Sequence, residues 1–185
     1  MPDLQRLVYV SRARLPLAGT AGSIHPEVGR ILRQSRRNNP RRGLVGALFF
    51  RDECFFQCLE GESSELDRLL ETLRADERHH DLKVLSRGPV AQLSFERWSM
   101  KYVPDAREVQ KLLTRHGQTL FDPYRFEPAL INSLVAFLVR GPDAPIEAAV
   151  APAARSIESR VRIALGMSTL AVALAVVALV LPLLR

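Results

Sequence analysis

Apolar residues in the first hundred positions recur with two periods, one of two residues and one of about 3.6 residues. The first period is typical of strands, and the second is typical of helices that bury one side. Turn-forming Gly, Pro, Asn and Asp residues separate the segments. The predicted order is βαββαββ, with strands at 4–13, 43–50, 53–61, 82–90 and 97–103 and helices at 23–39 and 63–76.

This order predicts an α+β fold, a ferredoxin-like βαββαββ sandwich in which one mostly antiparallel sheet carries both helices on the same face. In the first strand, alternation places Leu7 and Tyr9 on one face and Val8 and Val10 on the other. Two more helical stretches follow Val103, and they either cover the second face, cap the sheet edge or pair two copies of the chain. The predicted domains are residues 1–103 for the sheet and its helices, 104–140 for C-terminal cap helices, 141–162 for a Pro- and Ala-rich linker with a basic flank, and 163–184 for a further apolar segment.

Residues 163–184 form an apolar segment without a charged residue. As a helix it spans roughly 33 Å, which matches the thickness of a bilayer core. A buried core helix of that length would show more polar positions than Ser168 and Thr169. The sequence therefore predicts a single transmembrane helix.

The charges around this span predict its orientation. Arg155, Arg160 and Arg162 precede the span and only one arginine follows it, so the positive-inside rule places the N-terminal domain in the cytoplasm. Ala171 and Ala175 supply the small-xxx-small spacing that favours pairing of membrane helices. We expect a single-pass, membrane-tethered protein that forms a homo-oligomer.

The chain carries a formal charge of +6, mostly from arginine. Its densest basic stretch is RQSRRNNPRR, residues 33–42. This stretch has no interleaved aromatic residue and matches no nucleic-acid-binding motif, so we expect no nucleic-acid partner. Two interpretations stay open: a solvated helix end followed by a turn, or a surface that acts near a phosphate group or the membrane.

The two cysteines, Cys54 and Cys58, lie on one predicted strand. Four positions along a strand separate them by roughly 13 Å, which is too far for a disulfide. Both are expected to be reduced packing residues.

Polar residues inside apolar strands carry the strongest functional signal. The sequence contains no motif of a catalytic nucleophile, a P-loop or a metal site, so we expect neither an enzyme nor a bound metal. Gln57 shares a strand face with Phe55 and Leu59, where an unpartnered amide costs about 1–3 kcal/mol. Tyr9 lies in the apolar run LVYVS. These groups indicate hydrogen bonding to a flat ligand with several heteroatoms, held between the sheet and two helices.

The motifs that contain these residues resemble the BLUF domain, the blue-light sensor that uses FAD. The matching segments lie within residues 4–103 and are, in order, LVYVS, ILRQSRRNNPRRGLVGALFF, FFQCLEG, DERHHDLKVL and FERWSM. Their most specific feature is S-x-x-N-N followed, eighteen residues after the second Asn, by the Gln of F-x-Q-x-L-E-G. The sequence is thus identified as a member of that family, with FAD as its cofactor.

The resemblance implies a flavin site between the sheet and the two helices. The isoalloxazine ring would lie between Ile31 and Leu73, and Asn39 with Asn38 would bond the polar edge of its pyrimidine ring. The family pattern adds two residues on the ribityl-phosphate side. The implied cofactor-binding set is Tyr9, Ile31, Asn38, Asn39, Gln57, Leu73, Arg78 and His79.

The resemblance also implies a mechanism. Tyr9 would give the excited flavin an electron and then a proton, and Gln57, which would bridge the Tyr9 hydroxyl and the flavin, would end rotated or tautomerised. Its changed hydrogen bonds would shift the flavin spectrum to the red, and Trp98 and Met100 would relay the signal. The implied function is a reversible photoreceptor that signals to a partner protein of unknown identity.

Two alternatives come from other functional classes. A flavin-dependent redox enzyme requires a nicotinamide site or an open substrate pocket, and no fingerprint such as G-x-G-x-x-G is present. A flavin-free membrane scaffold with a BLUF-like fold would need neither Tyr9 nor Gln57, and both are present. Bound flavin and its response to light distinguish the three functions.

Overall fold

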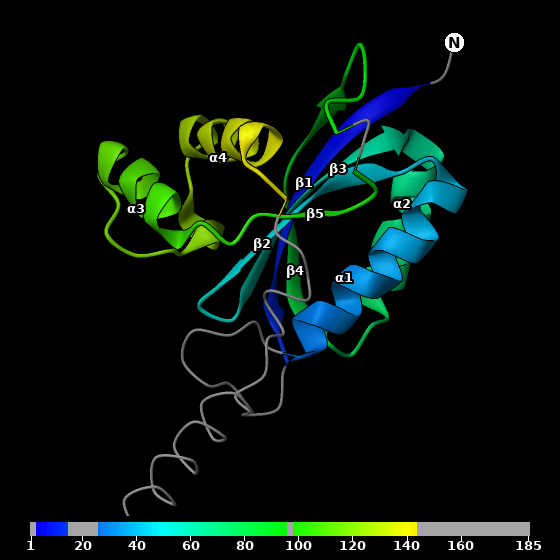
Figure 1. Ribbon diagram of the computed structural model, residues 1–185, viewed down its shortest axis with the longest axis horizontal. Coiled ribbons are helices and arrows are strands. Elements are labelled where there is room, and N and C mark those ends of the chain that lie inside the picture. Colours follow the sequence, from blue (N-terminus) through cyan, green and yellow to red (C-terminus); the bar gives the residue numbers. More distant parts are fainter. Residues whose placement is uncertain (1–2, 15–25, 96–97, 144–185) are drawn as a thin grey trace, which may run out of the picture. The chain divides into compact units, whose positions relative to one another are not determined.

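The computed structural model describes residues 3–14, 26–95 and 98–143. Within these residues the elements follow the predicted order βαββαββ, continued by two cap helices (Figure 1). The strands are β1 (Leu4–Ala13), β2 (Val45–Arg51), β3 (Cys54–Glu62), β4 (His79–Pro89) and β5 (Lys101–Tyr102), and the helices are α1 (Pro26–Asn38), η1 (Asn39–Arg42), α2 (Ser63–Arg74), α3 (Ala106–Arg115), η2 (Pro123–Arg125) and α4 (Pro128–Arg140).

The five strands form one sheet in the order β4-β1-β3-β2-β5. The pairs β1–β3, β1–β4 and β2–β3 are antiparallel, and β2–β5 is parallel, so the sheet is mixed. The central pair aligns Tyr9 of β1 with Gln57 of β3. Because both strands have neighbours on their other side, this pair lies in the interior of the sheet.

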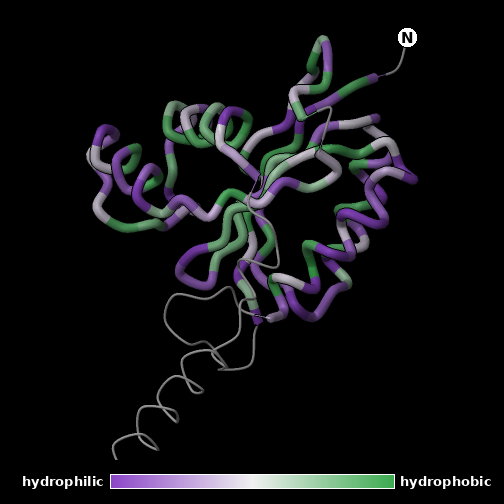
Figure 2. Tube along the Cα trace, viewed as in Figure 1, coloured by the Kyte–Doolittle hydropathy of each residue, from purple (hydrophilic) through white to green (hydrophobic). Residues whose placement is uncertain are grey.

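Each face of the sheet is covered by its own pair of helices (Figure 1). Leu7 and Tyr9 pack in one hydrophobic cluster with residues of α1 and α2. Val8 and Val10 pack in a second cluster with residues of α3 and α4. The alternation predicted for β1 is therefore confirmed. The cap helices α3 and α4 cover the face of the sheet opposite α1 and α2, which is one of the three roles considered for them. Figure 2 shows the hydrophobic strands between helices whose hydrophilic positions recur along their length.

Helix α1 follows from its sequence pattern. Val28, Ile31 and Leu32 are buried, as their helical spacing predicts. The α-helix ends at Asn38, and the chain continues as the 3-10 helix η1, which contains Pro40. Gly43 closes η1 with a φ of 62°, a left-handed conformation that glycine adopts without a steric cost. Ser23, the predicted N-cap, lies outside the described residues.

The last predicted strand is much shorter than its apolar pattern indicates. Residues 97–103 were expected to be extended, but β5 contains only Lys101 and Tyr102. The Trp98 N–H instead donates to the Phe95 carbonyl at 2.7 Å. The carbonyl of Ser99 is bonded by a side chain rather than by a neighbouring strand. Bonds from other parts of the chain therefore take the place of ladder bonds at the Trp98 N–H and the Ser99 carbonyl.

Both cysteines are buried and free, as predicted. Burial raises the pKa of the Cys54 thiol, and it raises the pKa of the Cys58 thiol to about 12. Because the thiolate is the reactive form, both groups are inert packing residues at neutral pH.

The described residues belong to one compact unit, residues 1–150, separate from residues 151–185. None of the helices within the described ranges is both long and apolar enough to cross a bilayer. The predicted transmembrane segment, residues 163–184, and most of the predicted linker lie outside the described residues.

Candidate functional site

Tyr9 and Gln57 are brought together by the register of β1 and β3, which places them directly opposite each other. Both side chains are buried, with Tyr9 at 0% and Gln57 at 3% exposure. They lie on the sheet face that α1 and α2 cover, because Tyr9 and the flanking residues Phe55 and Leu59 belong to the cluster on that side. A polar pair therefore lies within an apolar layer between the sheet and two helices.

The Tyr9 hydroxyl is an orphan within the part of the chain that the structure describes. It is fully buried, and no described side chain forms a well-aligned hydrogen bond with it, although the Gln57 amide lies close by. Burial raises the pKa of the phenol well above its usual range; the nearby Gln57 amide lowers it in part, and the Asp76 carboxylate raises it. A buried hydroxyl without a partner costs about 1–3 kcal/mol. The geometry thus indicates a ligand that supplies the missing acceptor.

Three more predicted site residues lie in the same apolar layer as Tyr9. Ile31 of α1 and Met100, which precedes β5, are buried. Leu73 of α2 is partly buried and packs against this cluster. Apolar side chains from both helices and from the β5 segment therefore surround the Tyr9–Gln57 pair.

Asn39 connects the end of α1 to the segment before β5. Its side chain is buried, and its Nδ2 donates to the Ser99 carbonyl at 2.7 Å. Asn38 is less enclosed; its Oδ1 accepts a long bond of 3.5 Å from the Arg37 guanidinium. Of the two asparagines, Asn39 is the one fixed inside the site.

His79 and Ser11 form a buried pair beside this layer. The Ser11 hydroxyl and His79 Nδ1 are 2.8 Å apart, and the His79 ring stacks near Phe55 with centroids 4.7 Å apart. Burial lowers the pKa of His79 to about 4, an effect that Asp76 opposes and Arg78 supports. The imidazole is therefore neutral at pH 7. Ser11 was not predicted as a site residue, although its position two residues after Tyr9 places it on the same face.

Arg78 is held at the end of α2 by its neighbours. Its guanidinium bonds both carboxylate oxygens of Asp76, with Nε contacts of 2.9 and 3.1 Å. A further bond of 3.1 Å reaches Gln34 Oε1 on α1. The ion pair raises the pKa of Arg78 and lowers that of Asp76. Arg78 therefore links the turn that follows α2 to helix α1.

Trp98 and Met100 differ sharply in exposure. Trp98 is 40% exposed, whereas Met100 is 3% exposed and lies in the cluster with Tyr9. The structure thus brings Met100, and not Trp98, into the layer around the polar pair.

Arg36 contacts the site without having been predicted to do so. Its Nε donates to the Met100 carbonyl at 2.9 Å, and its own carbonyl accepts from the Ser99 hydroxyl at 3.3 Å. The sequence shows Arg36 only as one member of a basic run, and no local pattern distinguishes it from its neighbours.

Comparison with known protein families identifies the first half of the chain. Residues 4–101 match the family described as sensors of blue light using FAD. The chain belongs to the BLUF family. FAD is accordingly the cofactor of this BLUF protein, and the match confirms the family predicted from the sequence motifs.

Curated relatives of this BLUF protein are much longer proteins. The photoactivated adenylate cyclase subunit beta of Euglena longa is 31% identical over 100 residues, which cover 54% of this chain and 11% of the relative. The alpha subunit of Euglena gracilis is 31% identical over 99 residues, 9% of its length. The match thus spans about a tenth of these relatives.

Solved structures extend the similarity beyond the family match. BlsA in its photo-activated state superposes with a TM-score of 0.68 and 29% identity over 77% of this chain and 99% of BlsA. The dark state of BlrB, a BLUF protein, superposes with a TM-score of 0.56 and 28% identity. The superposition covers 75% of this chain and 99% of BlrB. A bacterial light-regulated adenylyl cyclase superposes with a TM-score of 0.54 and 26% identity, and 40% of its chain is covered.

The residues of this BLUF protein fit a flavin. The orphaned Tyr9 hydroxyl is a buried donor that a heteroatom of a bound ring would satisfy. The opposed Gln57 amide adds donors and an acceptor. Ile31 and Leu73 offer apolar surface from the two helices. These residues would hold the isoalloxazine ring, and their chemistry matches its mixture of apolar faces and polar edges.

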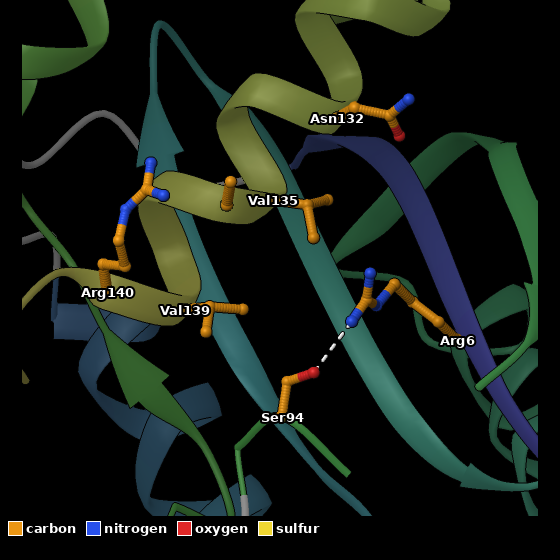
Figure 3. Close-up of a pocket in the computed structure, with 7 residues that line it drawn as sticks. Arg6, Ser94, Asn132, Val135, Val139 and Arg140 are labelled. Carbon is orange, nitrogen blue, oxygen red and sulfur yellow. Dashed lines mark hydrogen bonds between the residues drawn. The ribbon is translucent and has the colours of Figure 1, made fainter. Parts of the chain in front are cut away.

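A hollow of about 370 Å³ lies on the other side of the sheet (Figure 3). Arg6 lines it and donates to Ser94 Oγ at 2.9 Å, while Val135 and Val139 of α4 line its opposite wall. The buried Glu60 carboxylate accepts from Arg6 Nε at 2.7 Å and so neutralises its charge. Because Arg6 and Glu60 alternate along their strands with Leu7 and Leu59, this hollow is separate from the flavin site.

Proposed function

We propose that this BLUF protein is a membrane-tethered photoreceptor in which Tyr9 and Gln57 form the light-driven switch. The observation that carries the proposal is the fully buried Tyr9 hydroxyl, which lacks a protein partner among the described residues and lies opposite a buried glutamine. Membership of a family of blue-light sensors supports the same function.

The proposed mechanism assigns one task to each member of the pair. Bound FAD supplies, after absorbing blue light, a strong one-electron oxidant. Tyr9 would supply the electron and then the hydroxyl proton that this oxidant takes up, and both would return to Tyr9 before the switched state is reached; its raised pKa keeps that proton in place in the dark. The Gln57 amide ends with its donor and acceptor ends exchanged, by rotation or tautomerisation, and so presents different hydrogen bonds to its neighbours. The switch is reversible and transforms no substrate.

The signal leaves through the segment before β5. Met100 lies in the layer around Tyr9, and the neighbouring Ser99 carbonyl is bonded by Asn39. We assign the first relay step to Met100 because it is buried there, and a later, surface step to Trp98, which is exposed. Output then passes to a separate protein. Relatives named photoactivated adenylate cyclase carry the matched domain within much longer chains, which supports coupling to a second protein function.

The membrane tether rests on the sequence. The uncharged segment 163–184 and the arginines before it favour a single-pass anchor with the BLUF domain in the cytoplasm. Such a tether confines the downstream partner to the inner membrane face, and pairing of the anchors would make the receptor a homo-oligomer.

The test is an absorption spectrum of residues 1–150 reconstituted with FAD, recorded before and after blue light. A flavin spectrum that shifts to the red and recovers in darkness is the expected result. A bound flavin that is instead rapidly reduced by NAD(P)H would establish the redox enzyme. Failure to bind FAD would leave only the scaffold.

A further inference from the structure

The outer side of α1 and η1 carries charges that the fold does not use. Residues 28–44 contain no Asp or Glu and six arginines. Arg36 points into the domain, and Arg30 pairs with Glu27. The other four are exposed and form no ion pair with a described residue. This arginine face consists of Arg33, Arg37, Arg41 and Arg42.

The four residues of the arginine face lie close together along the chain, two in α1 and two in η1. Arg33 and Arg37 are four apart on α1 and are therefore neighbours on the same side of the helix. Arg41 and Arg42 follow at once in η1. Figure 2 shows hydrophilic positions recurring along α1. Like charges so close repel one another, and elsewhere the chain offsets such charges, as in the pair of Arg68 with Glu65.

The described chain ends beside this face. Asp143 is held by Arg36 NH2 at 2.9 and 3.0 Å, and its Oδ1 accepts from the Tyr102 N–H at 2.7 Å. Arg36 directly precedes Arg37. Asp143, the last described residue, is therefore held by the residue that directly precedes Arg37 of the arginine face.

We propose that the arginine face docks the BLUF domain on the anionic headgroups of a membrane. Guanidinium groups bind phosphate oxygens with paired hydrogen bonds, and each basic residue near an anionic surface strengthens binding by about fivefold. A nucleic-acid surface is disfavoured because residues 28–44 contain no aromatic residue on which bases would stack. The proposal adds a second contact to the tether of the proposed function.

Residues 1–150 suit the test because they form one compact unit. A comparable portion of the chain matches nearly all of BlsA, so a domain of this extent exists alone. Without residues 151–185, binding to lipid cannot come from the predicted anchor. The probes are vesicles of phosphatidylcholine alone and vesicles that also contain phosphatidylglycerol, and binding is measured by co-sedimentation at low and high salt.

The key comparison uses two variants that lose the same charge. In the first, Arg33, Arg37, Arg41 and Arg42 are all changed to Gln. In the control, the exposed residues Arg107, Arg115, Arg125 and Arg140 on the other side of the sheet are changed to Gln. We expect the control to bind anionic vesicles like the unmodified domain, and the first variant to bind at least about tenfold more weakly. A version with four Arg→Lys changes should retain binding.

Equal binding by both Gln variants, binding to neutral vesicles, or a preference for duplex DNA over anionic vesicles at equal phosphate would each overturn the proposal.

The flavin spectrum and its red shift are recorded on the same samples. A variant that loses lipid binding but keeps its photocycle is folded, and the loss then reports on the surface. If the quadruple variant does not fold, the pair Arg41→Gln and Arg42→Gln is compared with Arg107→Gln and Arg115→Gln. A domain that binds vesicles without any red shift would refute the sensor and leave the docking face standing.

Discussion

Arg36 and Asp143 form an ion pair between residues that lie 107 positions apart in the sequence, with N–O distances of 2.9 and 3.0 Å. The same carboxylate accepts from the Tyr102 N–H, and the same guanidinium donates to the Met100 carbonyl. The pair therefore fixes β5 between the end of α1 and the end of the described chain.

Changing Asp143 to Asn should loosen this edge of the domain. The variant keeps the shape of the side chain but removes the charge that strengthens its hydrogen bonds, so the free energy of unfolding should fall by about 1–3 kcal/mol. Urea unfolding measures the change. Asp52→Asn is the control, because Asp52 is paired with Arg51 at the exposed hairpin turn and should shift stability little. Equal losses in the free energy of unfolding would mean that the Asp143 bonds stabilise the domain no more than an exposed ion pair does.

Changing Gln57 to Leu should preserve a yellow flavoprotein and abolish the light-induced red shift. Leucine fills the buried position but has no amide whose donor and acceptor ends exchange. The absorption difference between dark and illuminated samples is the measurement. Gln110→Leu makes the same chemical change on α3, on the other side of the sheet, and should leave the shift intact. A normal red shift in Gln57→Leu would remove Gln57 from the switch.

Changing Tyr9 to Phe should stop the photocycle without weakening the FAD-free fold. The hydroxyl forms no hydrogen bond with a described residue, so its removal relieves a buried unpaired group and stability should stay constant or rise. Tyr124→Phe provides the contrast, since the Tyr124 hydroxyl donates to the Asp81 carbonyl at 2.9 Å. That change should cost about 0.5–1.5 kcal/mol. A photocycle that survives in Tyr9→Phe would require another electron donor.

His79 should make the domain less stable in acid. Its pKa is about 4 in the folded state and about 6.5 when exposed, so between these values the unfolded chain binds the extra proton and stability falls as pH falls. The full contribution is about 3 kcal/mol between pH 7 and pH 4. Urea unfolding of His79→Gln should show a correspondingly smaller loss over this range. An unaltered pH dependence in His79→Gln would contradict the assignment.

Deleting residues 155–185 should release the protein from membranes into the soluble fraction at physiological or higher salt. The prediction follows from the uncharged segment 163–184. A full-length variant with Leu174→Lys and Val177→Lys tests the same segment at constant length, because two central charges oppose insertion. Fractionation after a high-salt wash separates insertion from surface binding. Membrane retention of both variants in high salt would exclude the segment as the anchor.

The central part of the site was predictable because strand periodicity determines which face a residue occupies. Alternation along their own strands was enough to group Tyr9 with Leu7 and Gln57 with Phe55 and Leu59, and the structure shows that α1 and α2 cover this face. Their direct opposition depends on the register of β1 and β3, which the structure shows; the resemblance implied only that Gln57 bonds the Tyr9 hydroxyl.

Other features depend on contacts that leave no local signal. Arg36 resembles the arginines around it, and its contacts lie 64 and 107 positions away. The apolar pattern of residues 97–103 predicted a full strand, yet hydrogen bonds from other parts of the chain reduce it to β5. The same pattern gave no means of choosing between Trp98 and Met100 as the buried residue, because that choice depends on where the short strand begins.

The shortness of β5 has a consequence for amide hydrogen exchange. This edge strand pairs with β2 at only two positions, Ala47 with Lys101 and Leu48 with Tyr102. Two flanking bonds, from Gly46 N–H to the Trp98 carbonyl and from Val103 N–H to the Leu48 carbonyl, complete the junction. So few bonds open at a lower free energy than the long β1–β3 ladder. The Gly46 and Val103 amides therefore exchange with solvent through opening of this edge alone, and their exchange rates measure its stability in darkness and in light.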